Sequence, residues 1–343
     1  MHMADALLSP AVGTAMCVVS AGAMAYSLAK IKKDDVGEKK LPIMAVSGAL
    51  VFAAQMINFT IPATGSSGHI GGGILLAAMV GGQPGLLAIA AVLMIQCLFF
   101  ADGGLLALGC NIFNMGVIPC LLIYPLIFKP ILQRGMTKKR IAFASILSVV
   151  IGLQLGAFSV VLETLASGIT ELPFSAFLVM MQPIHLAIGV VEGIVTGAIL
   201  TFVYTTRREI LESSINDKQI SQKVSVKKTI AVLAIVTLIT GGGLSLFASA
   251  NPDGLEWAME KVAGTTELAG NSTIHNSAGK IQEGTAVMPD YDYGNGSKDK
   301  GISGTTVAGI VGSTMTFALA GLTAFIISRF KKRGKDGEYS QQS

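Results

Sequence analysis

The chain of 343 residues is strongly apolar, with 51% hydrophobic and only 13% charged residues. Soluble domains carry roughly 25% charged residues, so about half of the usual solubilising surface is missing. This composition excludes an ordinary cytosolic enzyme, a disordered chain and a nucleic-acid-binding protein. The four cysteines lie in apolar stretches without the spacing of a zinc site or a disulfide framework, so we expect buried thiols. The composition predicts a protein that crosses a lipid bilayer several times.

Nine apolar stretches are candidates for crossing a bilayer core of about 30 Å, which needs about 20 helical residues. In chain order they are 8–29, 41–61, 70–82, 85–101, 104–129, 141–166, 175–206, 228–250 and 304–328. The third and fourth are short and are separated by the turn Gly82–Gly85. A short span beside a glycine-rich loop indicates backbone that enters the membrane to line a cavity. We predict an all-α polytopic membrane protein.

Basic residues follow the first, fifth, seventh and ninth spans, which assigns those segments to the cytoplasm. On this assignment 21 of the 25 Lys and Arg residues are cytoplasmic, and the other four lie in the polar loop 251–303. The N-terminus is then outside and the C-terminus inside. The first residues lack the basic region of a secretory signal, and we expect Met1 to be retained before His2 with a free α-amine. We expect the inner membrane of a prokaryotic cell as the location.

The polar stretch 207–227 is interpreted as a flexible cytoplasmic linker between two fused modules. A seven-span unit, 1–206, precedes it, and a two-span hairpin, 228–333, carries the outer loop 251–303. Residues 334–343 form a cytoplasmic tail. Glycines in the last two spans, at 241–243, 309 and 312, would let the hairpin pack closely against the larger unit.

The first candidate for metal chemistry is the pair of residues that begins the chain. The amine of Met1, the deprotonated backbone nitrogen of His2 and its Nδ1 can chelate one ion through fused five- and six-membered rings. Three coplanar nitrogens leave one equatorial position open. Planar nitrogen coordination suits Ni(II) and Cu(II) better than Zn, Mg or Ca. Taken alone, a histidine at position 2 is more often accidental.

The second candidate is His69, in the glycine-rich stretch Thr64–Gly73 at the outer end of a short span. Glycines permit close backbone approach and positive φ angles, so this imidazole could supply the fourth nitrogen. A lone loop histidine is more often hydrogen-bonded to backbone. Because both histidines are predicted outside, among the first three spans, we favour a joint four-nitrogen site of Met1, His2 and His69.

Polar residues within or beside the spans are expensive in lipid and tend to face interior cavities. Those that could orient His2 and His69 or line the substrate path are Gln55, Asn58, Ser67, Gln96, Asn111, Asn114, His185 and Glu192. The alternative for the amides is ordinary hydrogen bonding between helices. His185 and Glu192, two turns apart, are interpreted as an intramembrane polar pair. His275, in the outer loop, has no partner at ligand spacing and is expected to be solvated.

Four ordered blocks resemble the CbiM/NikM family, the substrate-binding membrane subunits of energy-coupling factor transporters for cobalt and nickel. They are MHMADALLSP at the start, FAAQMINFTIPATGSSGHIGGG at 52–73, QCLFFADGGLLALGCNIFNMG at 96–116 and QPIHLAIGVVEG at 182–193. Asn251-Pro252-Asp253-Gly254-Leu255-Glu256 resembles the PDGLE-type small subunit of the same transporters. The whole chain therefore resembles a fused protein of both subunits.

This resemblance implies uptake of Ni(II) or Co(II) through the amine of Met1, His2 and His69. It also implies partnership with a transmembrane coupling protein and two cytoplasmic ATPases, which fits the lack of a GxxxxGK[ST] phosphate-binding loop in this sequence. We expect no enzymatic activity and no cofactor beyond the transported ion. The opening MHMADAL is more similar to the nickel branch, although cobalt stays open. The competing class is a self-sufficient secondary metal transporter or channel, with His185 and Glu192 as a proton relay.

Overall fold

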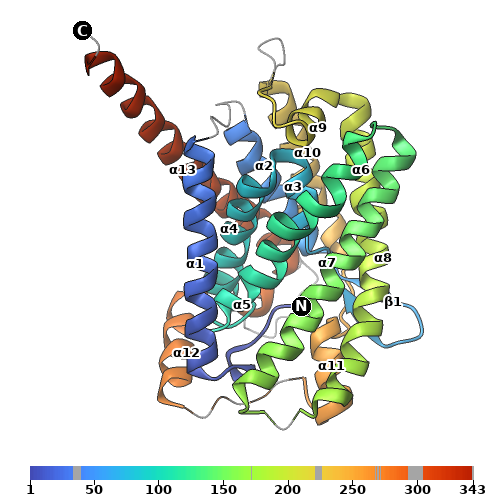
Figure 1. The fold of residues 1–343 in the computed structure, drawn as a ribbon. Coiled ribbons are helices and arrows are strands. Elements are labelled where there is room, and N and C mark those ends of the chain that lie inside the picture. The colour runs from blue at the N-terminus through green and yellow to red at the C-terminus, as the bar shows by residue number, and fades with distance from the viewer. Residues whose placement is uncertain are drawn as a thin grey trace.

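The computed structural model describes residues 1–33, 40–170, 172–220, 226–266, 268, 270, 272–292 and 304–341. The protein is a helical bundle, as predicted (Figure 1). Seven helical stretches in the described residues are long and apolar enough to cross a membrane, namely 10–33, 82–100, 108–133, 138–167, 174–206, 227–247 and 304–329. The prediction of an all-α polytopic membrane protein is confirmed.

The second and third predicted spans are interrupted by non-helical backbone. Helix α2 (Lys40–Gln55) ends early, and a short antiparallel hairpin follows it, formed by β1 (Phe59–Ile61) and β2 (Ser66–Gly68). Helix α3 (Gly73–Val80) has eight residues, a rise of only about 12 Å. Within the predicted span 70–82, this helix takes up only Gly73–Val80, and the irregular backbone before it lines the inner cavity, as expected for a short span beside a glycine-rich loop. Gly72 makes this change of direction, with a φ of 79° and Val51 packed where a Cβ would stand.

The remaining helices of the first part are long, apart from the short segments α5 and α6. Helix α1 (Pro10–Lys33) begins this part of the chain, and α4 (Gly82–Phe100) follows α3. The next stretch is helical almost throughout: it consists of α5 (Leu108–Ile112), a π-helical segment (Phe113–Phe128) and α6 (Lys129–Gln133). Two prolines, Pro119 and Pro125, lie inside the π-helical segment, where their missing N–H groups favour a wider winding. Helices α7 (Lys138–Ser167) and α8 (Phe174–Thr206) pack along each other.

The second part begins with an ordered helix where a flexible linker was expected. Helix α9 (Arg208–Ile215) buries Ile210, Leu211 and Ile215, and Ser214 donates to the carbonyl of Ala77. The end of the predicted linker, 221–225, lies outside the described residues. The linker prediction is therefore wrong for its first half, because an apolar stripe on α9 packs against α3.

The predicted hairpin packs against the first part through α2. Its helices are α10 (Val226–Gly242) and α13 (Gly304–Gln341), with a 3₁₀ turn at Leu244–Phe247 after α10. Both contact α2, and Gly312 lies against the ring of Phe52. Gly241 lies against the backbone of Gly309, so small residues bring α10 and α13 together.

The loop 251–303, which was predicted to lie outside, also forms helices within its described residues. These are α11 (Gly254–Ala263), α12 (Thr273–Thr285) and a 3₁₀ turn at Pro289–Tyr291. They lie with β1 at one end of the bundle, whereas α6, α9 and the end of α13 lie at the other (Figure 1). A short 3₁₀ turn at Asp5–Leu7 precedes α1, and the chain before it runs into the bundle between these elements, so the N-terminus lies in the interior (Figure 1).

Candidate metal centre

Backbone hydrogen bonds hold the first residues of the chain inside the bundle. The side chain of Asn111 accepts from the N–H of Met3 at 2.7 Å and donates to its carbonyl at 3.2 Å. The carbonyl of Met3 also accepts from the N–H of Gly104, and Asp5 accepts from the N–H of Ala107. Asn111, predicted to orient the site, therefore acts on the backbone beside His2.

The α-amine of Met1 is paired with a carboxylate from the second part of the chain. Its nitrogen lies 2.5 Å from Oδ2 of Asp253, while Oδ1 of Asp253 accepts from the N–H groups of Leu255 and Glu256 as the N-cap of α11. Burial would raise the pKa of Asp253, but the adjacent Met1 ammonium outweighs it and holds this pKa well below its usual range. Asp253 is therefore an anion fixed at the amine.

The two histidines predicted as ligands lie side by side. Their rings are stacked, with centroids 5.1 Å apart and planes inclined by 17°. Burial lowers the pKa of His2 to about 3 and that of His69 to about 4, and the Met1 ammonium adds to both effects. Both imidazoles are therefore neutral at physiological pH, the form that binds metal ions.

A chain of hydrogen bonds fixes which nitrogen of His2 carries the proton. The amide nitrogen of Gln55 donates to the carbonyl of Gly71 at 3.0 Å, because a carbonyl can only accept. The amide oxygen of Gln55 is therefore the acceptor for the amide nitrogen of Gln96, at 2.7 Å. The oxygen of Gln96 then faces Nε2 of His2 at 3.2 Å, and Nε2 must be the donor. This leaves Nδ1 of His2 unprotonated and able to bind metal. The amides predicted to orient the histidines thus link His2 to the loop that carries His69.

The ring of His69 provides one further nitrogen with a lone pair. Nδ1 of His69 lies 3.0 Å from the carbonyl of Ile70, so it donates and Nε2 is unprotonated. Nδ1 of His2 faces Oδ1 of Asp102 at 3.2 Å. Because both of these atoms are acceptors, a proton or a cation has to lie between them. Burial raises the pKa of Asp102, which favours a proton there when no metal is bound.

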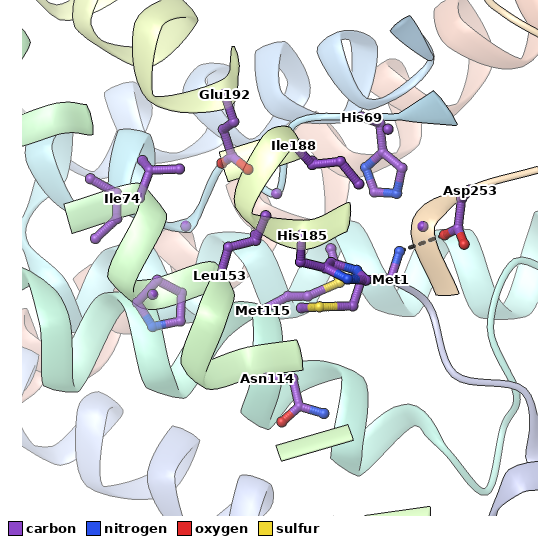
Figure 2. Close-up of a pocket in the computed structure, with 17 residues that line it drawn as sticks. Met1, His69, Ile74, Asn114, Met115, Leu153, His185, Ile188, Glu192 and Asp253 are labelled. Atoms are coloured by element: carbon purple, nitrogen blue, oxygen red, sulfur yellow. Dashed lines mark hydrogen bonds and ion pairs between the residues drawn. The ribbon is translucent and has the colours of Figure 1, made fainter. Parts of the chain in front are cut away.

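Two cavities meet at this group of nitrogens. An outer cavity of about 380 Å³ is lined by His2, His69, Asp102, Asp253 and Glu256, among others. An inner cavity of about 40 Å³ is lined by Met1, His69, Asp253, His185 and Glu192, among others (Figure 2). His69 and Asp253 line both cavities. The candidate ligands therefore lie where the acidic outer cavity adjoins the inner cavity.

The second part of the chain contacts the site at several points, through residues that sequence reasoning did not identify. Ser67 donates to the carbonyl of Asn251 at 2.8 Å, and the hydroxyl of Tyr291 donates to Asp102 at 2.5 Å. Trp257 donates to the carbonyl of Thr64. Asp102 directly follows an apolar span, and Asp253 directly follows a proline in a turn. A carboxylate just beyond the end of a span was the only sequence signal that pointed to these two residues.

The prediction that His275 is solvated is wrong. Its side chain is buried, and Nε2 lies 3.1 Å from the carbonyl of Asp5 and 2.9 Å from that of Leu8. Ser272 contacts its Nδ1. His275 thus binds the backbone of the N-terminal segment. It does so from α12, a helix that the sequence pattern did not predict.

The other predicted residues lie around the two cavities. Asn58 lines the outer one, and its carbonyl accepts from the N–H of Ser249. Asn114 donates to Glu163, an intramembrane carboxylate that sequence reasoning missed. Asn114, His185 and Glu192 all line the inner cavity. His185 and Glu192 thus face the same space, although no hydrogen bond joins them among the described contacts.

Side chains alone do not make a metal site here. Within the described residues, no group of three or more His, Cys, Asp or Glu side chains is placed to hold one ion. A nitrogen set would therefore need the Met1 amine and backbone nitrogen in addition to His2 and His69. These features define a polytopic helical membrane protein with a buried, nitrogen-rich centre at one end.

The chain belongs to the CbiM family, described as the cobalt uptake substrate-specific transmembrane region, whose profile matches residues 2–210. A second profile, that of the PDGLE domain, matches residues 227–329. The resemblance identified in the sequence is thereby confirmed, and the protein is a member of a nickel and cobalt transport family.

Relatives and solved structures agree with this membership. A putative fused nickel transport protein NikMN of Archaeoglobus fulgidus is 29% identical over 97% of this chain and 99% of its own length. A probable fused nickel transport protein LarMN of Lactiplantibacillus plantarum is 39% identical over 34% of this chain and 36% of its own. A crystal structure described as a truncated transition metal transporter matches with a TM-score of 0.52 and 27% identity, over 60% of this chain and 99% of that one.

Proposed function

We propose that this protein captures Ni(II), or Co(II), outside a prokaryotic inner membrane as the substrate-binding component of an ATP-driven energy-coupling factor importer. The ion is bound by four nitrogens: the amine of Met1, the backbone nitrogen and Nδ1 of His2, and Nε2 of His69. The observation that carries this proposal is the hydrogen-bond chain through Gln96 and Gln55, which keeps Nδ1 of His2 unprotonated.

The choice of metal follows from the donor set. Two neutral imidazoles, an amine and an amide nitrogen favour planar coordination, which suits Ni(II) more than Zn(II) or the hard cations. The names of the fused relatives support nickel, whereas a relative of Methanocorpusculum labreanum is named a putative cobalt transport protein. Nickel is therefore our first choice and cobalt the second.

Net charge supports an exchange of one metal ion for two protons. Without metal, the Met1 ammonium and the Asp253 carboxylate cancel each other. With Ni(II) bound to a neutral amine and a deprotonated amide, the same carboxylate again makes the local sum zero. A buried centre tolerates such an exchange because no unpaired charge is created.

The division of labour follows the two profile matches. Residues 1–206 supply every proposed ligand, and residues 228–333 form a second module that covers the site through Asp253 and Tyr291. Transport is driven by a transmembrane coupling protein and two cytoplasmic ATPase subunits, which the membership of a cobalt uptake family supports. The N-terminus then faces outward and the end of α13 faces the cytoplasm.

The alternative is a self-sufficient secondary transporter or channel, which the two titratable side chains of His185 and Glu192 beside the inner cavity favour. Transport by the purified chain in proteoliposomes without ATP and without partners would support this alternative and contradict the importer.

Nickel titration of the purified full chain tests the proposed site, together with absorption spectroscopy at the nickel K-edge. We expect one tightly bound ion with four nitrogen neighbours, two of them imidazoles, in the unmodified chain. A chain that binds no nickel tightly, or binds it with mainly oxygen neighbours, contradicts the proposal.

A further inference from the structure

The inner cavity is lined by acceptor atoms that have no donor. It shares His69 and Asp253 with the outer cavity, and Met1, which is paired with Asp253, also lines it (Figure 2). Its volume of about 40 Å³ exceeds the roughly 10–15 Å³ that one water molecule needs. The cavity is therefore large enough for a small occupant.

His185 presents an unprotonated nitrogen to this cavity. Its Nδ1 lies 2.8 Å from the carbonyl of Met181 and must donate to it, so Nε2 keeps a lone pair. Nε2 is buried without a hydrogen-bond partner, in a side chain that is 1% exposed. It lies next to Gly254, beside the carboxylate that holds the Met1 amine.

Glu192 and Asn114 each add a buried oxygen that has no hydrogen-bond donor. Oε1 of Glu192 accepts from the N–H of Gly72 at 2.9 Å, at the start of α3, but Oε2 has no partner. Asn114 uses its amide nitrogen on Glu163, and its Oδ1 is also buried and unpartnered. Glu163, by contrast, uses both oxygens, one on Asn114 and one on Ser159.

Three buried acceptors around one cavity require an occupant that attracts lone pairs, because buried polar atoms without partners are rare and costly. None of the residues that line this cavity in the described structure is Lys or Arg. The Met1 ammonium, which also borders it, is already held by Asp253. A cation with its bound water molecules offers a partner to each of the three acceptors.

We propose that this cavity is a second, inner site for a divalent transition-metal ion, held by Nε2 of His185 and, through bound water, by Oε2 of Glu192. The proposal rests on the proposed function, because it supplies the next position for an ion that leaves the outer nitrogens. Imidazole, carboxylate and water together suit Ni(II), Co(II) and Zn(II). His185 and Glu192 are seven residues apart, about 10.5 Å along the helix, so water has to bridge part of the distance.

The test uses the purified full chain, nickel chloride as the only probe, and equilibrium dialysis with metal analysis. The double variant His2→Ala/His69→Ala removes the outer set, and it should still bind one ion, with one imidazole neighbour at the nickel K-edge. Glu192→Gln or His185→Ala, added to this double variant, should weaken that remaining binding by about ten- to a hundredfold. Asp217→Asn is the control, since it neutralises a carboxylate that pairs with Lys129 at the other end of the bundle, and it should leave the inner ion in place.

The outcomes separate the inner site from the proposed function. If the unmodified chain binds one ion and the double variant none, the inner site is refuted while the outer site stands. If Asp217→Asn weakens the remaining binding as much as Glu192→Gln does, the effect comes from the charge of the protein in general, and the inner site is again refuted. Thermal unfolding and gel filtration of each variant identify misfolded protein, and His185→Gln replaces His185→Ala if the latter misfolds.

Discussion

The amino group of Met1 and the carboxylate of Asp253 form an ion pair at 2.5 Å across a sequence separation of 252 residues. Met1 belongs to the part matched by the CbiM profile and Asp253 to the part matched by the PDGLE profile. The same carboxylate caps α11 through its other oxygen. One residue therefore connects the folding of the second module to the position of a proposed ligand.

Addition of one residue before Met1 should abolish tight nickel binding. The added residue moves the α-amine out of the contact with Asp253 and turns the nitrogen of Met1 into an amide, so the amine and His2 no longer share the buried arrangement beside His69. We expect the affinity to fall by about a hundredfold or more, measured by calorimetric titration. The control is one residue added at the C-terminus, and unchanged affinity of the N-terminal variant would contradict the site.

The two histidines should differ in their importance. His2→Ala removes a ligand and one chelate ring, whereas His69→Ala leaves three tethered nitrogens and lets water take the fourth position. We expect a larger loss of nickel affinity for His2→Ala than for His69→Ala, measured by competition with a chelator of known affinity. Equal losses would indicate that the amide of His2 is not a ligand.

Gln96→Leu should weaken nickel binding although Gln96 touches no metal. The variant removes the acceptor for Nε2 of His2, so the ring can protonate at Nδ1 instead. Loss of such a supporting partner costs about ten- to a hundredfold in metal affinity. Gln154→Leu, which removes an amide that bonds between α7 and α8 away from the site, is the control and should bind nickel normally.

Asp253→Asn should weaken nickel binding while α11 stays folded. Asparagine is as good an N-cap as aspartate, so the change removes the charge at the Met1 amine and preserves the cap. We expect a loss of about tenfold, with unchanged helicity by circular dichroism. Asp217→Asn removes the ion pair with Lys129 at the other end of the bundle and should have no effect on binding.

Nickel binding should release protons and weaken as the pH falls. The pKa values of about 3 for His2 and about 4 for His69, both lowered by burial, mean that neither imidazole releases a proton near pH 7. The protons come from the amine and the amide, so between about one and two should be released per ion. Titration in buffers of different ionisation enthalpy counts them, and fewer than one per ion would exclude amide ligation.

Sequence reasoning was most successful where the signal is local. Apolar runs predicted the long helices, and polar residues inside those runs pointed to Gln55 and Gln96, because an amide in lipid needs a partner. The break before α3 was indicated only by its glycines, and the turn there needs the positive φ of Gly72 and the absence of a side chain that would meet Val51.

The missed residues depend on contacts between distant parts of the chain. Asp102 and Tyr291 are 189 residues apart, and His275 reaches Leu8 across 267. Nothing in the local pattern around His275 distinguishes a solvated loop from a helix that docks on the N-terminal segment. Such pairings follow from how the two modules pack, which their separate hydropathy patterns do not encode.

The contact between Met1 and Asp253 also sets an order of events during biosynthesis. At about 5–20 residues per second, the ribosome adds residue 253 roughly 13–50 seconds after Met1. Throughout that interval the amine has no carboxylate from α11, even if the first seven predicted spans are already inserted. In the fused chain the Met1 amine and Asp253 are always present in equal numbers, because they belong to the same polypeptide. The amine therefore meets its carboxylate without a search for a separate subunit in the membrane.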